Sequence, residues 1–434
     1  MGRKKKTKIC ESPEEDRLSQ LPEHLISEIL YHLSTKDAVR TSVLSTRWRC
    51  LWQSVPGLDL GPVRFLNSDS LVSFVERFFD SHMDSWIRKL RLDFFYRQGR
   101  LDISSWIDAV TTRTIQHLDV ACFRDNELQI PPSLYTCETL VHLRLCEVTL
   151  SNADFVSLPC LKFMHLLYNR YPNEATLQKL ISGSPVLEVL TIIRSWNDDD
   201  KANVLLVRSL TLKRVYINDG IQVVIDAPLL QCLKATVSSS KNFQIVNLGS
   251  SAKLDIGFPY CHATYSSMIP DILTDISRVR ELVIMNATFW KEIFQYSKLG
   301  PVLQFRDLSH LSVTFSKSNL EMLPTLLESC PKVESFVLEL VTDGFMGGRK
   351  KKEPKLLFPT VPQCLLSSLK FVEWKRSIVG YEGEIELIRY LLKNSTMLEK
   401  LRLNIYYSKK AMCDFLKELV AMPRCSTACE VLVL

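Results

Sequence analysis

The chain has 434 residues, of which 46% are hydrophobic, and carries a formal net charge of +6. This length and composition allow a sizeable core, and a domain size of about 150 residues predicts two or three domains rather than a disordered chain. The positive excess lies in two short runs, Arg3 to Lys8 and Arg349 to Lys355, and the remainder is slightly acidic. Because nucleic-acid binders spread their cations along a surface that follows phosphates, nucleic acid is not the expected partner.

The 13 cysteines are scattered from Cys10 to Cys429, and no two of them form a C-x-x-C pair. This usage predicts reduced thiols rather than a secreted disulfide framework. No segment approaches the ~20 apolar residues of a membrane span, and the basic N-terminal run is not followed by the apolar stretch of a signal peptide. We expect an intracellular protein, in the nucleus and/or the cytoplasm, with no membrane partner. The run Arg3 to Lys8 fits a nuclear-import signal and a solubilising tail equally well.

Residues 1–15 are polar and lack periodicity, which predicts a disordered basic tail. An amphipathic helix is expected next, because apolar residues then recur at four-residue spacing: Leu21, Leu25, Ile29 and Leu33, with Ile26 and Leu30 beside them. Pro22 suits its first turn. Ser34 and Asp37 predict a capping-box start for a second helix. Ser45 is expected to cap a third helix, which carries Trp48, Leu51 and Trp52.

After Pro56 a unit of the form apolar-x-x-apolar-x-apolar recurs along the chain, as in IRKLRL and LEKLRL. Its fourth positions are Leu90, Leu118, Leu143, Met164, Leu190, Val215, Leu233, Leu254, Leu282, Leu311, Phe336, Val372 and Leu401. The spacing runs from 18 to 29 residues, apart from a step of 36 residues before Val372 that contains the glycine- and lysine-rich run. Such a period is typical of a leucine-rich-repeat solenoid, in which stacked repeats complete one another's core.

The repeats are degenerate in two respects. The Asn that usually follows the strand and bonds the turn backbone appears in one unit, as Asn169. The register at Val215 is ambiguous, because Leu210 and Leu212 compete for the same position. The long step before Val372 predicts an insertion in a surface loop.

Two segments resemble parts of one plant protein family. The segments DRLSQLPEHLISEIL, STKDAVRTSVLSTRWRCLW and VPGLDL resemble the F-box of plant F-box proteins from Asp16 to about Leu60. The stretch from LLFPTVPQC to LEKLRL resembles the FBD region that ends many of these chains. Together they resemble an F-box/FBD/LRR-repeat protein over nearly the full chain.

The resulting fold class is α+β and multi-domain, with an N-terminal three-helix F-box followed by an α/β leucine-rich-repeat solenoid that ends in an FBD region. The expected boundaries are 1–15 for the tail, 16–60 for the F-box, 61–354 for the solenoid and 355–434 for the FBD region, which completes the solenoid.

The resemblance implies a substrate-recognition subunit of a ubiquitin ligase, docked through the F-box on a Skp-type adaptor and through it on a cullin and a RING protein. The residues expected to contact the adaptor are Leu21, Pro22, Leu25, Ile29, Leu30, Trp48 and Trp52. Buried tryptophans are common interface hot spots. Val39, Leu44 and Leu51 are expected in the internal core, and Glu23, His24 and Glu28 at the rim of the contact.

Residues that flank the buried position of each strand point to the opposite sheet face. Those predicted to bind an unknown protein target are Lys89, Arg91, His117, Asp119, His142, Arg144, His310, Lys400 and Arg402, with Ser312 beside them. The competing interpretation is that this polar strip is simply a solvated sheet face. A metal ladder along His117, His142 and His310 is not expected, because Glu281 interrupts the series.

Catalytic motifs are not found in the sequence. There is no phosphate loop, no G-x-G-x-x-G, no H-E-x-x-H, no G-x-S-x-G and no zinc spacing of the RING type. We expect a non-enzymatic chain with no cofactor and no metal, and we read the acidic triplet Asp198, Asp199 and Asp200 as solvated. The alternative function is an LRR scaffold or nucleic-acid-associated protein that does not recruit a ligase.

Overall fold

A computed structural model describes residues 18, 20–61, 68–82, 86–94, 102–122, 128–194, 204–219, 222–237, 243–249, 252–257, 279–285, 290, 304–342, 360–376, 382–404 and 409–434. The predicted tail at residues 1–15, the acidic triplet at residues 198–200 and the basic run at residues 349–355 lie outside this part. The chain forms two compact units, Met1–Leu150 and Ser151–Leu434. No described helix is long and apolar enough to cross a membrane.

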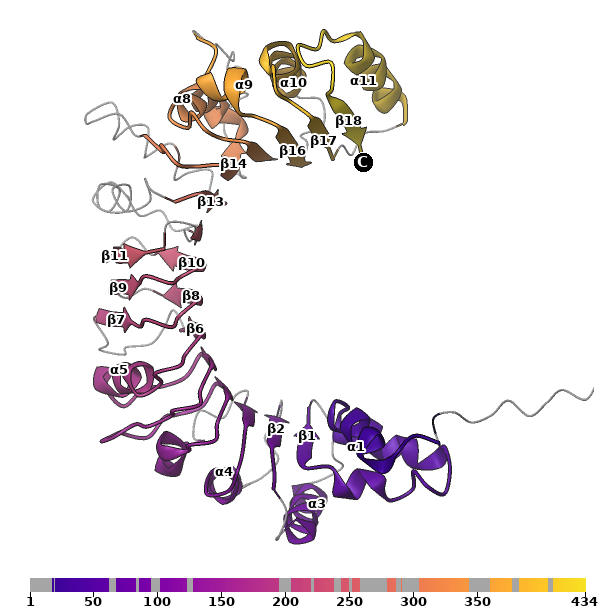
Figure 1. The fold of residues 1–434 in the computed structure, drawn as a ribbon, viewed down its shortest axis with the longest axis vertical. Coiled ribbons are helices and arrows are strands. Elements are labelled where there is room, and N and C mark those ends of the chain that lie inside the picture. The colour runs from indigo at the N-terminus through magenta and orange to yellow at the C-terminus, as the bar shows by residue number, and fades with distance from the viewer. Residues whose placement is uncertain are drawn as a thin grey trace, which may run out of the picture. The chain divides into compact units, whose positions relative to one another are not determined.

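The first unit begins with helices and continues as a parallel sheet (Figure 1). Its helical elements are α1 (Glu23–Tyr31), α2 (Thr35–Arg40), α3 (Ser68–Ser81) and α4 (Ile103–Thr111), with the 3-10 turns η1 (Thr41–Val43), η2 (Leu51–Ser54) and η3 (Pro132–Thr136). Its strands are β1 (Gly57–Leu60), β2 (Lys89–Phe94), β3 (His117–Cys122) and β4 (His142–Cys146), adjacent in chain order. Helices α3 and α4 lie on one side of these strands (Figure 1).

The first two predicted helices form, and the third does not. Ser34 caps α2 by accepting a hydrogen bond from the Asp37 backbone N–H at 3.1 Å, and its hydroxyl donates to the Asp37 carboxylate at 2.7 Å. Where a helix starting at Ser45 was expected, residues 46–50 form turns and the chain continues as η2. The prediction was wrong because a spacing of three between Trp48 and Leu51 suits a tight 3-10 turn as well as an α-helix.

The second unit extends the same repeat with parallel strands. Its main sheet runs β5 (Phe163–Leu167), β6 (Val189–Ile193), β8 (Arg214–Asp219), β10 (Cys232–Val237), β12 (Lys253–Gly257), β13 (Glu281–Ile284), β14 (His310–Ser316), β15 (Ser335–Val341), β16 (Phe371–Arg376), β17 (Lys400–Leu403) and β18 (Glu430–Val433). The described helical elements beside it are α5 (Glu174–Ser182), η4 (Lys317–Met322), α8 (Leu323–Glu328), α9 (Gln363–Ser367), α10 (Glu382–Asn394) and α11 (Lys409–Ala421).

A second, three-stranded parallel sheet was not predicted. It consists of β7 (Val204–Arg208), β9 (Gln222–Ala227) and β11 (Phe243–Leu248), in the order β11-β9-β7. These segments lie in the connections between strands of the main sheet. They contain the β-branched residues Val and Ile, which favour strands. They were not predicted because they do not follow the spacing of the repeat unit.

The predicted repeat register is confirmed at every fourth position. In the first unit Leu90, Leu118 and Leu143 stand opposite one another across neighbouring strands. In the second unit the aligned positions are Met164, Leu190, Val215, Leu233, Leu254, Leu282, Leu311, Phe336, Val372 and Leu401. All of these side chains are at most 1% exposed, and Val215 takes the ambiguous position. The structure adds one position at each end of the series, Leu58 and Val431.

The residues that follow β4 and β5 adopt the same left-handed backbone conformation. Tyr168 follows β5, Glu147 follows β4, and both have φ of 55°. Non-glycine residues adopt this left-handed conformation rarely, so the turn is a defined feature of the fold. Asn169 comes directly after Tyr168 and is fully buried.

Candidate functional site

The first surface of interest is α1, in the segment that resembles an F-box. Leu25 and Ile29 stand one turn apart on its outer face and are 43% and 42% exposed. Pro22 is also exposed, at the N-cap of the helix. Leu21 is half-buried against the core. The outer face of α1 is therefore apolar where a soluble helix is ordinarily polar.

Two of the predicted adaptor contacts are instead internal. Leu30 and Trp48 are buried in a cluster with Ile26, Ala38 and Val55, so they hold the helices together and present no surface to a partner. Trp52 is half-buried, and its ring stacks on Phe74 of α3 with centroids 6.4 Å apart. Trp48 therefore serves the fold of the first unit, which corrects its assignment as a surface anchor, and the assignment of Trp52 stays a prediction.

The opposite correction applies to two predicted core residues. Val39 and Leu44 are exposed, and Val43 between them is more exposed still. The reason is local: α2 has only six residues, its inner face is taken by Thr35 and Ala38, and the chain then tightens into η1. The change of helical period turns the following side chains outward. Leu51 remains packed against the core as expected.

Polar residues surround the apolar pair on α1. Glu23, His24 and Glu28 are exposed between and beside Leu25 and Ile29, as predicted for a rim. The carboxylate of Glu28 also lies 3.3 Å from the His32 imidazole one turn later. An apolar centre with a polar border is the usual composition of a protein interface.

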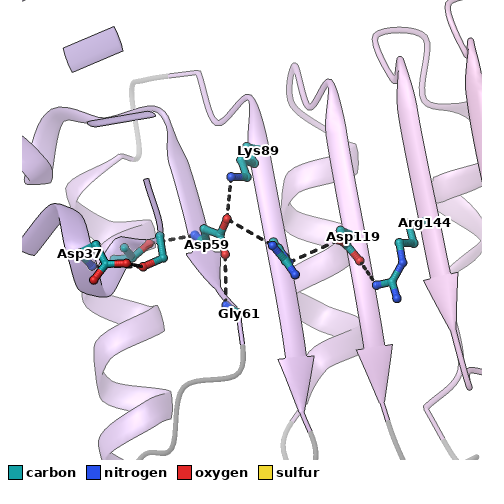
Figure 2. Close-up of polar contacts among 9 residues, drawn as sticks. Asp37, Asp59, Gly61, Lys89, Asp119 and Arg144 are labelled. Carbon is teal, nitrogen blue, oxygen red and sulfur yellow. Dashed lines mark hydrogen bonds and ion pairs between the residues drawn. The ribbon is translucent and has the colours of Figure 1, made fainter. Parts of the chain in front are cut away.

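Asp59 joins the helical segment to the sheet. Its backbone N–H donates to the Thr35 hydroxyl at the start of α2, at 2.8 Å. Its carboxylate accepts from the Gly61 backbone N–H at 3.1 Å and from the Lys89 ammonium at 2.6 Å (Figure 2). The side chain is nearly buried. The backbone of Asp59 thus contacts α2, and its carboxylate connects β1 to β2.

From Asp59 an ion-pair ladder crosses the open face of the first sheet (Figure 2). Arg91 lies 4.0 Å from the Asp59 carboxylate and 3.4 Å from that of Asp119. Asp119 also accepts a hydrogen bond from Arg144 at 2.7 Å. These residues occupy matched positions on β2, β3 and β4. Burial lowers the pKa of Arg144, but its hydrogen bond and charge contact with Asp119 give a net rise.

A groove of about 280 Å³ opens beside this ladder, and its lining combines the end of α1 with the strand face: Tyr31, His32, Lys89, Leu90, Arg91, His117, Asp119 and His142. The rings of His117 and His142 are 5.9 Å apart. Burial, then the neighbouring His142 and Lys89, lowers the pKa of His117. The groove is an open recess in which the surroundings of His117 disfavour a positive charge on its ring.

The predicted target-binding residues separate into two groups. Lys89, Arg91, His117, Asp119, His142 and Arg144 lie together on the first sheet. In the second unit, His310 on β14 stands between Glu281 and Ser335. Lys400 pairs with Glu430 at 3.7 Å, and Arg402 pairs with Glu373 at 3.6 Å and stacks over the Phe371 ring. Most charges along the strip are therefore paired across neighbouring strands.

Three residues of the groove and the ladder were not predicted as site residues: Asp59, Tyr31 and His32. Asp59 lies in VPGLDL, whose alternation would have identified a further strand had the repeat been extended back by one unit. Tyr31 and His32 end α1, and no local pattern indicates that they meet the strand face. Within the part of the chain that the structure describes, no group of three or more His, Cys, Asp or Glu side chains is placed to hold a metal ion.

Three family models match the chain in the order of its elements. Residues 18–59 match the F-box domain, residues 103–257 match the model described as "FBD-associated F-box protein At5g56370, LRR repeats", and residues 359–403 match the FBD model. The repeats match over strands β3 to β12, and the FBD model ends with β17.

Relatives match this chain along nearly its whole length, and two of the three named here are called F-box/FBD/LRR-repeat proteins. F-box/FBD/LRR-repeat protein At1g51370 of Arabidopsis thaliana is 64% identical over 439 residues, covering 100% of both chains. F-box/FBD/LRR-repeat protein At5g53840 of the same plant is 48% identical, covering 99% of this chain and 98% of its own. F-box/LRR-repeat protein 13 is 38% identical, covering 100% and 99%. The chain belongs to the F-box/FBD/LRR-repeat protein family.

Proposed function

We propose that this chain is the substrate-recognition subunit of a Skp-cullin-F-box type ubiquitin ligase. The F-box docks on a Skp-type adaptor, the adaptor holds a cullin with its RING protein, and the repeats bind a protein target. The chain supplies no chemistry of its own in this proposal. It raises the effective concentration of the target beside a ubiquitin-charged enzyme, so that its contribution to rate is proximity.

The observation that carries the proposal is the exposed apolar pair Leu25 and Ile29 on α1, within the region that matches the F-box model. Each fully buried aliphatic side chain is worth about 1.5–3 kcal/mol, so covering their remaining exposed fraction would contribute about 1 kcal/mol each. Val39, Val43 and Leu44 add further exposed apolar surface on the next two elements. Leaving these side chains in water is unfavourable, and a docked partner removes that cost.

Target recognition is proposed for the polar strand face, chiefly on the first sheet. There the groove and the ladder of Lys89, Arg91, Asp119 and Arg144 lie on one continuous run of strands. The ion-pair ladder orders these side chains before a target arrives. A preorganised surface loses less conformational entropy on binding than a flexible one.

The test is a calorimetric titration of the full chain with a purified Skp-type adaptor. Leu25→Ala combined with Ile29→Ala removes about 2 kcal/mol of apolar burial and should weaken binding roughly thirtyfold, while leaving the buried Ile26 and Leu30 in place. The matched control is Val420→Ala, at an apolar position of α11 that is 79% exposed, and it should bind like the wild type. Failure of the wild-type chain to bind would favour the alternative, a repeat scaffold that recruits no ligase.

A further inference from the structure

The groove at the end of α1 contains one cation whose hydrogen-bonding capacity is unused. Lys89 donates to Asp59 and Arg144 donates to Asp119, at 2.6 and 2.7 Å. Among the described residues, Arg91 has only its two loose ion pairs at 3.4 and 4.0 Å, and its Nε is buried with no hydrogen-bond partner. A guanidinium carries five N–H donors in a planar fork that matches the two oxygens of an oxyanion.

The charge of the lining also favours an anion. The lining contains two cations, Lys89 and Arg91, and one carboxylate, Asp119, which already accepts a hydrogen bond from Arg144. Outside the lining, Asp59 accepts from Lys89, and Asp93 interacts electrostatically with Arg91. The other polar groups of the lining include three imidazoles, those of His32, His117 and His142, which can donate hydrogen bonds and accept a proton beside an anion. Burial is the largest cause of the lowered pKa of His117, and the charges of His142 and Lys89 lower it further.

The size of the groove limits the occupant. Its volume of about 280 Å³ lies at the lower end of the range of about 300–1,000 Å³ of small-molecule sites. It fits one side chain or one small charged group. Because it opens on the strand face, an extended segment that lies across β2, β3 and β4 can insert one residue into it.

From these observations we infer that the groove binds a single acidic side chain of a target peptide, with Arg91 as the bidentate partner of its carboxylate or phosphate oxygens. The inference rests on the proposed function, because it names the chemistry of the target that the strand face receives. A carboxylate and a phosphate both accept two hydrogen bonds from a guanidinium, and the phosphate carries the larger negative charge. A phosphorylated residue would place a second negative charge beside the imidazoles.

The experiment uses the full chain and fluorescein-labelled peptides of the form Gly-Ser-Ser-X-Ser-Ser-Gly, with X as Glu, Gln or phosphoserine, followed by anisotropy. The Glu or the phosphoserine peptide should bind at least tenfold more tightly than the Gln peptide. Arg91→Gln should abolish this preference and Arg91→Lys should retain part of it. The control Arg376→Gln removes an exposed arginine with an equally loose ion pair, at 4.0 Å from Glu339, and should retain the full preference.

A second readout separates direct binding from a structural effect. On addition of the preferred peptide, the His117 imidazole resonances of the wild-type chain should shift, and the pKa of His117 should rise, because an anion stabilises the imidazolium. Equal binding of all three peptides, or an Arg91→Gln variant that keeps the preference, would overturn the inference. Adaptor binding by Arg91→Gln should be unchanged, so failure of the groove and failure of the proposed ligase role give different results.

Discussion

At the residue scale, the elements packed against α1 decide which of its apolar side chains are buried and which reach the surface. Leu25 and Ile29 were expected on the outer face of α1, where the structure exposes them. Leu30 and Trp48 were assigned to the same surface, and they lie in the core. The nine-residue helix α1 has apolar side chains on two faces. Which of the two faces is buried depends on the elements that pack against it. Those neighbours are long-range contacts that periodicity does not encode.

Asp59 illustrates a residue whose role follows from three contacts. Replacing it with alanine removes the acceptor for Lys89 and Gly61 and keeps the backbone N–H that donates to Thr35. The loss of a charged, nearly buried hydrogen bond should therefore lower the opening free energy of β1 and β2 by about 2–3 kcal/mol. Native-state hydrogen exchange of these amides measures this change directly.

Asp307→Ala is the control for Asp59→Ala. Asp307 pairs with Lys332 at 3.2 Å with both side chains mostly exposed, so its loss should change protection by less than about 0.5 kcal/mol. Equal effects of the two substitutions would show that the Asp59 carboxylate does not stabilise the pairing of β1 with β2.

At the element scale, the repeat register followed from the sequence because its spacing is a packing requirement. One apolar side chain in each strand must stack on those of its neighbours, so the fourth position recurs wherever a strand does. The third F-box helix and the β7-β9-β11 sheet did not follow. The helix was not predicted correctly because a spacing of three between apolar residues fits a 3-10 turn as well as an α-helix. The β7-β9-β11 sheet was not predicted because its strands pair with one another outside the repeat unit.

Leu311 tests this requirement within the second unit. It stands between Leu282 and Phe336 in the buried row, so Leu311→Ala leaves a cavity and should lower the opening free energy of β14 and β15 by about 3–4 kcal/mol. Ser312→Ala, on the opposite face of the same strand, should cost less than about 1 kcal/mol. Hydrogen exchange of the β14 and β15 amides compares the two variants, and similar losses would contradict a buried row that carries the packing.

At the scale of the whole molecule, the net charge of +6 says little about partners. On the described strand faces, Lys and Arg side chains form ion pairs with Asp and Glu side chains of neighbouring strands. Lys234 pairs with Asp255 at 3.3 Å in the second unit, as Lys89 pairs with Asp59 in the first. Pairing across neighbouring strands orders these side chains, and exposed pairs of this kind add little stability. Recognition is therefore expected where the pairing is incomplete, as at Arg91, rather than where charge is most abundant.

The most direct measurement is reconstitution of the ligase core from the full chain, a purified Skp-type adaptor and a cullin, followed by size-exclusion chromatography with light scattering. The proposed role predicts one species whose mass equals the sum of the three chains, and loss of this chain from that species in the Leu25→Ala, Ile29→Ala variant. An adaptor–cullin complex that elutes at its own mass, with the wild-type chain in a separate peak, would contradict it.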